Sequence, residues 1–142
     1  MKAVIAAVLL VAACGDDGGS MPDARLVDAL PPDAAPTEVI MESRGLELLE
    51  SAELILTAEP GDIAVITLSA VDEIGWNIHG HAGGGTQIVD EGRGIKMLDR
   101  YVFSPPAAAD WYILIRNESS SGANQSVDIK VELYGDIPWR WQ

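Results

Sequence analysis

Residues 126–134 read SVDIKVELY, and this stretch decides the fold. Every second residue from Val127 to Leu133 is apolar, and the residues between them are charged. Successive side chains of a β-strand point to opposite faces of the sheet, so this spacing places one face in a core and the other in water. The stretch therefore predicts a half-buried strand of an antiparallel sheet.

Apolar stretches of similar length run back from this strand to residue 37, separated by turn residues such as Pro60-Gly61-Asp62 and Gly83-Gly84-Gly85. We therefore expect an all-β domain, an antiparallel β-sandwich of jelly-roll type with about eight strands. Residues 43–53 also have helical spacing, which leaves a helix as the alternative there. The predicted strands are 37–43, 46–58, 63–71, 76–81, 87–90, 96–103, 111–117 and 126–134.

The N-terminus has the pattern of a bacterial lipoprotein signal. Residues 10–14 read LVAAC, and Cys14 is the only cysteine in the chain. Lys2 and the apolar run 3–13 precede it, and this run is too short for a membrane-spanning helix, which takes about 20 residues. We expect residues 1–13 to be removed and Cys14 to carry acyl chains that hold the protein on the membrane. An ordinary secretory signal is the alternative.

Residues 14–36 form the next segment, which is rich in Gly, Asp, Ala and Pro and has no strand or helix period. This composition predicts a disordered linker with a reach of about 25 Å. Its Cys-Gly-Asp-Asp-Gly-Gly start, followed by Pro-Asp-Ala repeats, resembles lipoproteins of myxobacteria. The β domain then comprises residues 37–142, a common size for one core. The expected location is the bacterial cell envelope, on the outer membrane or the periplasmic face of the inner membrane.

The charge balance is strongly acidic, with 22 Asp and Glu against 9 Lys and Arg and a net charge of −13. This field repels phosphate backbones, so we expect no nucleic-acid partner. With one cysteine no internal disulfide can form, and packing alone must stabilise the domain.

Three further stretches carry a family resemblance: Pro60-Gly61-Asp62, Trp76-Asn77-Ile78-His79, and residues 110–117, which read DWYILIRN. Together with the closing valine-rich strand they resemble a GOLD domain, a β-sandwich module of Golgi cargo receptors and lipid-transfer proteins. The turn into Asp110-Trp111-Tyr112 is also similar to that of pre-peptidase C-terminal domains, which are secreted bacterial sandwiches. Both resemblances imply a binding or accessory module.

Both histidines of the chain, His79 and His81, lie at the end of a predicted strand that enters a glycine turn. On a strand they share one face with Asn77 and project into solvent or a groove, where two imidazoles can bind one metal ion. In an oxidised compartment this favours zinc or copper(II), with no other cofactor expected. Surface histidines without a metal are the alternative. The third ligand would come from Asp72, Glu73, Asp90 or Glu91.

The C-terminal tail holds Trp139, Arg140 and Trp141. These residues are candidates for contact with a ligand or partner as an exposed aromatic strip, and folding back over a sheet edge is the favoured alternative. We expect Trp76 and Trp111 to pack in the core.

No motif for a nucleophile or an acid–base pair emerges from the sequence, and we expect no enzyme. We also expect Arg116 to be a surface ion-pair partner. The sequence favours a non-enzymatic, lipid-anchored module that binds an envelope protein, a glycan or a small ligand. The second hypothesis is a metal-handling lipoprotein that uses His79 and His81.

Overall fold

The computed structural model describes residues 34–142. The predicted signal peptide 1–13, Cys14 and the predicted linker up to residue 33 lie outside the described residues, and what the sequence predicts for them stays a prediction. Within the described range, no helix is long and apolar enough to cross a bilayer.

The domain is all-β, as the sequence predicts, and every pairing between its strands is antiparallel. A short 3-10 helix, η2 (Ala82–Gly84), forms the tip of one hairpin. The strands are β1 (Glu38–Leu46), β2 (Ser51–Ala58), β3 (Ile63–Gly80), β4 (Gln87–Phe103), β5 (Ala109–Asn117), β6 (Gln125–Tyr134) and β7 (Trp139–Trp141).

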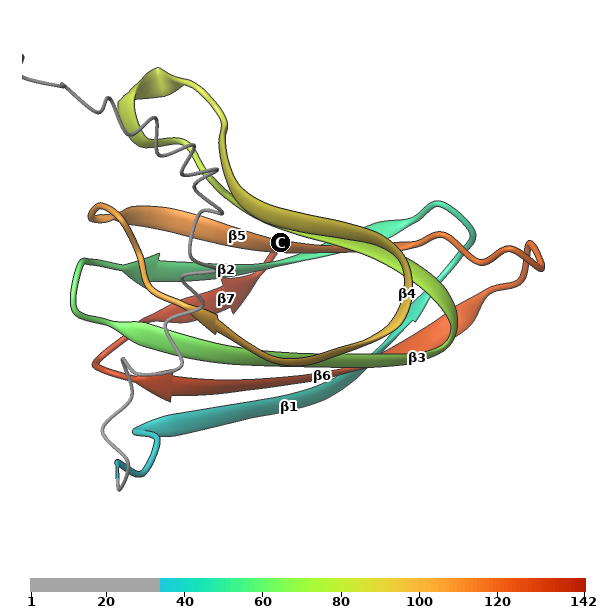
Figure 1. The fold of residues 1–142 in the computed structure, drawn as a ribbon, viewed down its shortest axis with the longest axis horizontal. Coiled ribbons are helices and arrows are strands. Elements are labelled where there is room, and N and C mark those ends of the chain that lie inside the picture. The colour runs from blue at the N-terminus through green and yellow to red at the C-terminus, as the bar shows by residue number, and fades with distance from the viewer. Residues whose placement is uncertain (1–33) are drawn as a thin grey trace, which may run out of the picture.

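The long strand β3 organises the sheet. One of its edges pairs with β4, while its other edge pairs first with β6, over residues 63–70, and then with β5, over residues 74–80. The strand order is therefore β1-β6-β3-β5-β2-β7. Figure 1 shows β3 and β4 curving together at one end of the molecule, so that β5 and β2 face β6 and β1. The sheet is curled into a half-barrel.

Two predicted breaks between strands are bends within strands. Residues 63–71 and 76–81 form the single strand β3, and 87–90 and 96–103 form β4. The pairing register between these strands shifts at several places, including between Ser69 and Ile74. Polar and glycine residues that interrupt the apolar alternation thus mark bulges, which let the paired strands turn without ending.

Between β1 and β2, in contrast, the structure has a turn where the sequence predicts a continuous strand. The predicted strand 46–58 is split by a turn at 47–50, where Leu49 has a φ of 65°. The backbone nitrogen of Glu50 donates to the carbonyl of Glu47 at 3.0 Å and closes this turn. The helical alternative for residues 43–53 is therefore wrong, because strand pairing on both sides of the turn satisfies the backbone instead.

The core lies inside the curl. The alternation of β6 is confirmed, since Val127, Val131 and Leu133 have no exposed surface while Asp128 is exposed. Trp76 and Trp111 also belong to the core, as predicted. Trp111 is fully buried, and its ring centroid lies 5.5 Å from that of Phe103.

The C-terminal tail folds back along a sheet edge as strand β7, which pairs with β2. It also meets β1, because Trp139 Nε1 donates to Glu38 Oε1 at 2.8 Å and the Arg44 guanidinium lies 4.0 Å from the centroid of the Trp141 ring. Glu42 and Arg44 form an ion pair of 3.0 Å on the same strand. Charged side chains at the margin between two edge strands disfavour pairing with another sheet.

Candidate functional site

A cavity of about 380 Å³ lies on the outer face of the half-barrel, over β3 and β5. We call it the outer cavity. Asn77 and Leu114, which are opposite each other in the β3–β5 pairing, line it together with Arg116. Leu49 from the β1–β2 turn and Arg93 from the bend of β4 complete its margins.

Strand alternation explains why these side chains line the outer cavity. On β5, Trp111, Ile113 and Ile115 are buried in the core, so Leu114 and Arg116 point the other way. Gly75 is opposite Arg116, and the Glu118 carboxylate lies over it.

Gly75 also allows a close approach by a neighbouring side chain. A Cβ at this position would lie 2.7 Å from the carboxylate of Glu118. The absent side chain therefore lets Glu118 lie across the strand, where its Oε1 is 3.9 Å from Arg93 Nε.

The margins of the outer cavity depend on Asn117, which is fully buried. Its backbone carbonyl accepts from the nitrogen of Leu49 at 3.0 Å, and its own nitrogen donates to the carbonyl of Glu50 at 3.0 Å. The side chain accepts from the nitrogen of Ser119 at 2.9 Å. Asn117 thus fixes the turn that carries Leu49 and the start of the loop that carries Glu118.

Arg116 differs from every other cation in the described part of the chain. Six of the seven described Lys and Arg side chains form an ion pair, and Arg116 forms none. Its Nε atom is buried without a hydrogen-bond partner. The prediction that Arg116 is a surface ion-pair partner is therefore wrong. Its neighbours across the sheet, Gly75 and Ser51, carry no charge, and Glu118 is turned to Arg93.

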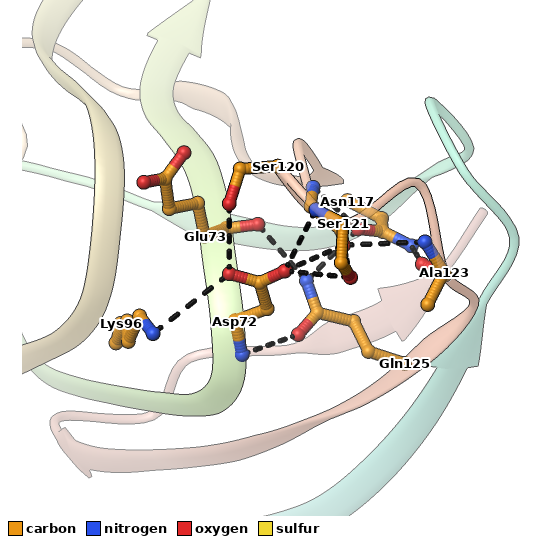
Figure 2. A network of polar contacts seen from close by, with 9 residues as sticks. Asp72, Glu73, Lys96, Asn117, Ser120, Ser121, Ala123 and Gln125 are labelled. Atoms are coloured by element: carbon orange, nitrogen blue, oxygen red, sulfur yellow. Dashed lines mark hydrogen bonds and ion pairs between the residues drawn. The ribbon is translucent and has the colours of Figure 1, made fainter.

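The loop beside the outer cavity, residues 118–124, is held by a carboxylate on β3. Figure 2 shows Asp72 among the serine hydroxyls of this loop. Asp72 accepts hydrogen bonds from Ser119 Oγ at 2.7 Å, Ser121 Oγ at 3.0 Å and Ser120 Oγ at 3.3 Å. These bonds, led by that of Ser119, hold the pKa of Asp72 well below its ordinary value. Lys96 Nζ adds an ion pair at 3.8 Å.

The same loop replaces the strand pairing that β3 lacks at its bend. The nitrogen of Glu118 and the Nε2 of Gln125 both donate to the carbonyl of Glu73, at 3.1 and 2.9 Å. The Oε1 of Gln125 accepts from the nitrogen of Asp72 at 2.9 Å. The backbone of β3 is thus satisfied where β6 has ended and β5 has not begun.

The two histidines lie together, but only one is exposed. The ring centroids of His79 and His81 are 5.3 Å apart, and both rings lie 5.1 Å from that of Tyr112. His79 is buried, and its Nδ1 donates to Asn77 Oδ1 at 2.7 Å. Burial lowers the pKa of His79, and nearby Glu53 opposes this effect. The sequence predicts that His79 projects into solvent or a groove, whereas in the structure it is buried with its ring stacked on that of Tyr112.

The structure brings no third metal ligand to this pair. Across residues 34–142, no group of three His, Cys, Asp or Glu side chains is arranged to hold a metal ion. The zinc or copper site at His79 and His81 therefore stays a prediction that rests on two side chains.

The tail residues that were candidates for partner contact are engaged within the domain. Trp139 and Trp141 are half-buried and pack against the core. Arg140 is exposed, and its Nη2 lies 2.8 Å from Asp110 Oδ2. A hydrogen bond from Thr57, together with the one from Arg140, lowers the pKa of Asp110, and Asp110 raises that of Arg140. The fold-back arrangement is the one observed.

Sequence reasoning missed the outer cavity. Its residues come from four separate segments, and the register that sets Gly75 opposite Arg116 is not visible in either strand alone. One signal in the sequence was available. Arg116 lies on the polar face of its strand, and the residue two positions before it on that face is Leu114, which is not a carboxylate.

The fold defines an all-β domain of antiparallel strands, which was compared with known proteins. No family model and no curated protein matches the chain. Among solved structures, the chain is similar to the crystal structure of the Yersinia pseudotuberculosis-derived mitogen (YPM), with a TM-score of 0.54 and 14% sequence identity. The match covers 71% of this chain and 89% of the mitogen chain. At this identity the likeness establishes the fold alone.

Proposed function

We propose that this protein is a non-enzymatic binding module, held at the bacterial cell envelope by a lipid on Cys14. The observation that carries the proposal is Arg116, a half-buried guanidinium without a partner in an open cavity. Leaving a buried donor unpaired costs about 1 to 3 kcal/mol, so folded proteins rarely keep one without a reason. The terminal nitrogens of the same guanidinium are not buried, and a ligand that binds in the outer cavity would supply acceptors to them.

The state of the other polar groups supports binding over catalysis. Glu118 faces Arg93, Asp72 is surrounded by donors, and His79 is bonded to Asn77. Among the described residues, no serine hydroxyl bonds to either histidine, and the hydroxyl that contacts His81 is that of Thr86, whose Oγ1 lies 3.4 Å from His81 Nδ1. A general base needs a free proton-accepting group beside its substrate, and these groups are engaged elsewhere.

The envelope part of the proposal rests on the sequence. The lipobox-like residues 10–14 and the acidic linker are typical of a module displayed at a distance from a membrane. The GOLD-like and pre-peptidase-like stretches favour the same class of protein.

The anchor is tested by metabolic labelling with palmitate. We expect the wild-type chain to take up label and the Cys14→Ser variant to take up none, with both chains exported. Equal labelling of the two chains would contradict the anchor.

Binding is tested on the full-length Cys14→Ser chain by ¹⁵N–¹H NMR. A panel of neutral sugars, acidic sugars, amino acids and organic acids is added one compound at a time at millimolar concentration. We expect at least one compound to shift the amide signals of Gly75, Asn77 and Arg116 in a saturable way. Absence of saturable shifts at these residues across the whole panel would contradict a binding role for the outer cavity.

A further inference from the structure

The charge distribution in the outer cavity is specific. Arg93 and Arg116 line it together with Glu91 and Glu118, and Arg93 is already paired with Glu118. Within residues 34–142 the guanidinium of Arg116 is left without a partner, although the whole chain has 22 acidic residues against 9 basic ones. Within that range its Nε makes no hydrogen bond and its guanidinium makes no ion pair, although the Glu118 carboxylate lies over Gly75 on the neighbouring strand.

The accessible end of this guanidinium is its pair of terminal nitrogens. Within the Arg116 side chain only the Nε is both buried and unbonded, so the two Nη groups are in contact with solvent, and they donate no hydrogen bond within the described residues. Two parallel N–H donors on a planar group match the two oxygens of a carboxylate. The arginine therefore offers an end-on fork to a ligand in the outer cavity.

The remaining walls suit a small ligand with several hydroxyl groups. Ser51, Asn77 and Glu91 provide polar groups, while Leu49 and Leu114 provide apolar surface against which a ring can pack. A volume of about 380 Å³ falls within the range of roughly 300 to 1,000 Å³ that small-molecule pockets occupy. Two carboxylates in the same cavity disfavour a dianion, because only one arginine is free to balance it.

We infer that the outer cavity binds an acidic sugar, whose carboxylate is held by the terminal nitrogens of Arg116. This inference rests on the proposed binding function and names the ligand class. The carboxylate contributes the charge, and the sugar hydroxyls bond to the polar walls. Arg93 is not assigned this role because its side chain is largely exposed and its Nε already lies 3.9 Å from Glu118 Oε1.

The test compares sodium glucuronate with glucose, which has the same ring and a CH₂OH group in place of the carboxylate. Both are titrated into the ¹⁵N-labelled Cys14→Ser chain, and the side-chain Nε–H signal of Arg116 is followed. Glucuronate is expected to shift this signal and the amide of Gly75 saturably, and glucose to bind at least tenfold more weakly. Inorganic phosphate serves as the anion control and is expected to shift them less than glucuronate does.

Two variants separate the fork from charge alone. Arg116→Gln is expected to weaken glucuronate binding at least tenfold, and Arg116→Lys, which keeps the charge without the planar fork, is expected to weaken it as well. The matched control is Arg140→Gln, which removes the same charge from an arginine that is paired with Asp110 outside the cavity. It is expected to bind as the parent chain does. Well-dispersed spectra of each variant verify folding.

The outcomes distinguish this inference from the function on which it rests. Equal binding of glucose and glucuronate, unaffected by Arg116→Gln, would overturn the proposed contact between a carboxylate and Arg116. It would not contradict the proposal that the outer cavity binds a ligand. Stronger shifts with phosphate, or an equal loss in Arg140→Gln, would overturn it in favour of unspecific attraction of anions. No shift with glucuronate would also overturn it, and the wider ligand panel then decides the binding function by itself.

Discussion

Replacing Asn117 by alanine is predicted to destabilise the domain by about 3 kcal/mol. The Nδ2 group donates to the carbonyls of Leu46 at 3.1 Å and Ala123 at 3.0 Å, and the Oδ1 accepts from the nitrogen of Ser119 and the Nε2 of Gln125, both at 2.9 Å. The bonds to Leu46 and Ser119 are buried, so alanine leaves two backbone groups without water or a partner. Each costs about 1 to 3 kcal/mol.

Urea unfolding followed by tryptophan fluorescence measures this change, since Trp111 is fully buried in the folded state. With a denaturant slope of about 2 kcal/mol/M, the Asn117→Ala midpoint should fall by about 1.5 M. The control is Asn124→Ala, an exposed residue whose Oδ1 accepts one hydrogen bond, from the nitrogen of Leu48 at 3.3 Å. Its effect should stay within about 0.5 kcal/mol.

A midpoint for Asn117→Ala within about 0.3 M of the parent would refute this reasoning, because it would mean that water replaces the lost bonds. Hydrogen exchange provides a second measurement. Since Asn117 fixes both the β1–β2 turn and the loop 118–124, we expect faster exchange in both segments of the variant, through local openings that cost less free energy than the opening of β6. Loosening of these segments would also weaken any ligand that binds in the outer cavity.

Three further predictions concern packing and pH. Gly80→Ala should lower stability by about 1 to 3 kcal/mol in thermal unfolding, because the new Cβ would lie 2.7 Å from the ring of Trp111, whereas Gly85→Ala meets no atom within 4 Å and should be neutral. Because the pKa of Asp72 is lowered in the folded state, the unfolded chain binds more protons at acid pH. The stabilisation that Asp72 contributes should be complete above its ordinary pKa of 3.8 and be lost progressively below that value. In Asp72→Asn the urea midpoint should therefore fall less between pH 6 and pH 3 than it does in the parent chain. Burial lowers the pKa of His79, so its NMR titration should fall below 6.5 and stability should decrease as the pH drops through that value; a midpoint at or above 6.5 would contradict this.

The class of the fold could be predicted because its signal is local. The alternation in 126–134 reports directly which side of β6 is buried, and β5 shows the same pattern. The continuity of β3 and β4 could not be predicted in this way. Val71-Asp72-Glu73 and Gly92-Arg93-Gly94 have the composition of turns, and only their mutual pairing, with its register shifts, makes them bends within strands.

The candidate site could be predicted only in part, for a related reason. The pairing of His79 with His81 follows from strand geometry, but the burial of His79 depends on Tyr112, which belongs to another strand. Arg116 shows the limit more clearly. Whether an arginine finds a carboxylate depends on which side chains the register sets beside it, and here those neighbours are Gly75 and Ser51.

The bend of β3 accounts for both the closure of the sheet and the presence of the outer cavity. At residues 71–73 the edge of β3 changes partner from β6 to β5, and the chain between those partners must leave the sheet as the loop 118–124. Asp72, at the bend itself, holds that loop through its serines. The loop begins with Glu118, which lies over Gly75 and faces Arg93, and Arg116 is left open as a result. The curvature that makes the half-barrel therefore also leaves Arg116 unpaired. A straight β3 would produce neither the closure of the sheet nor the outer cavity.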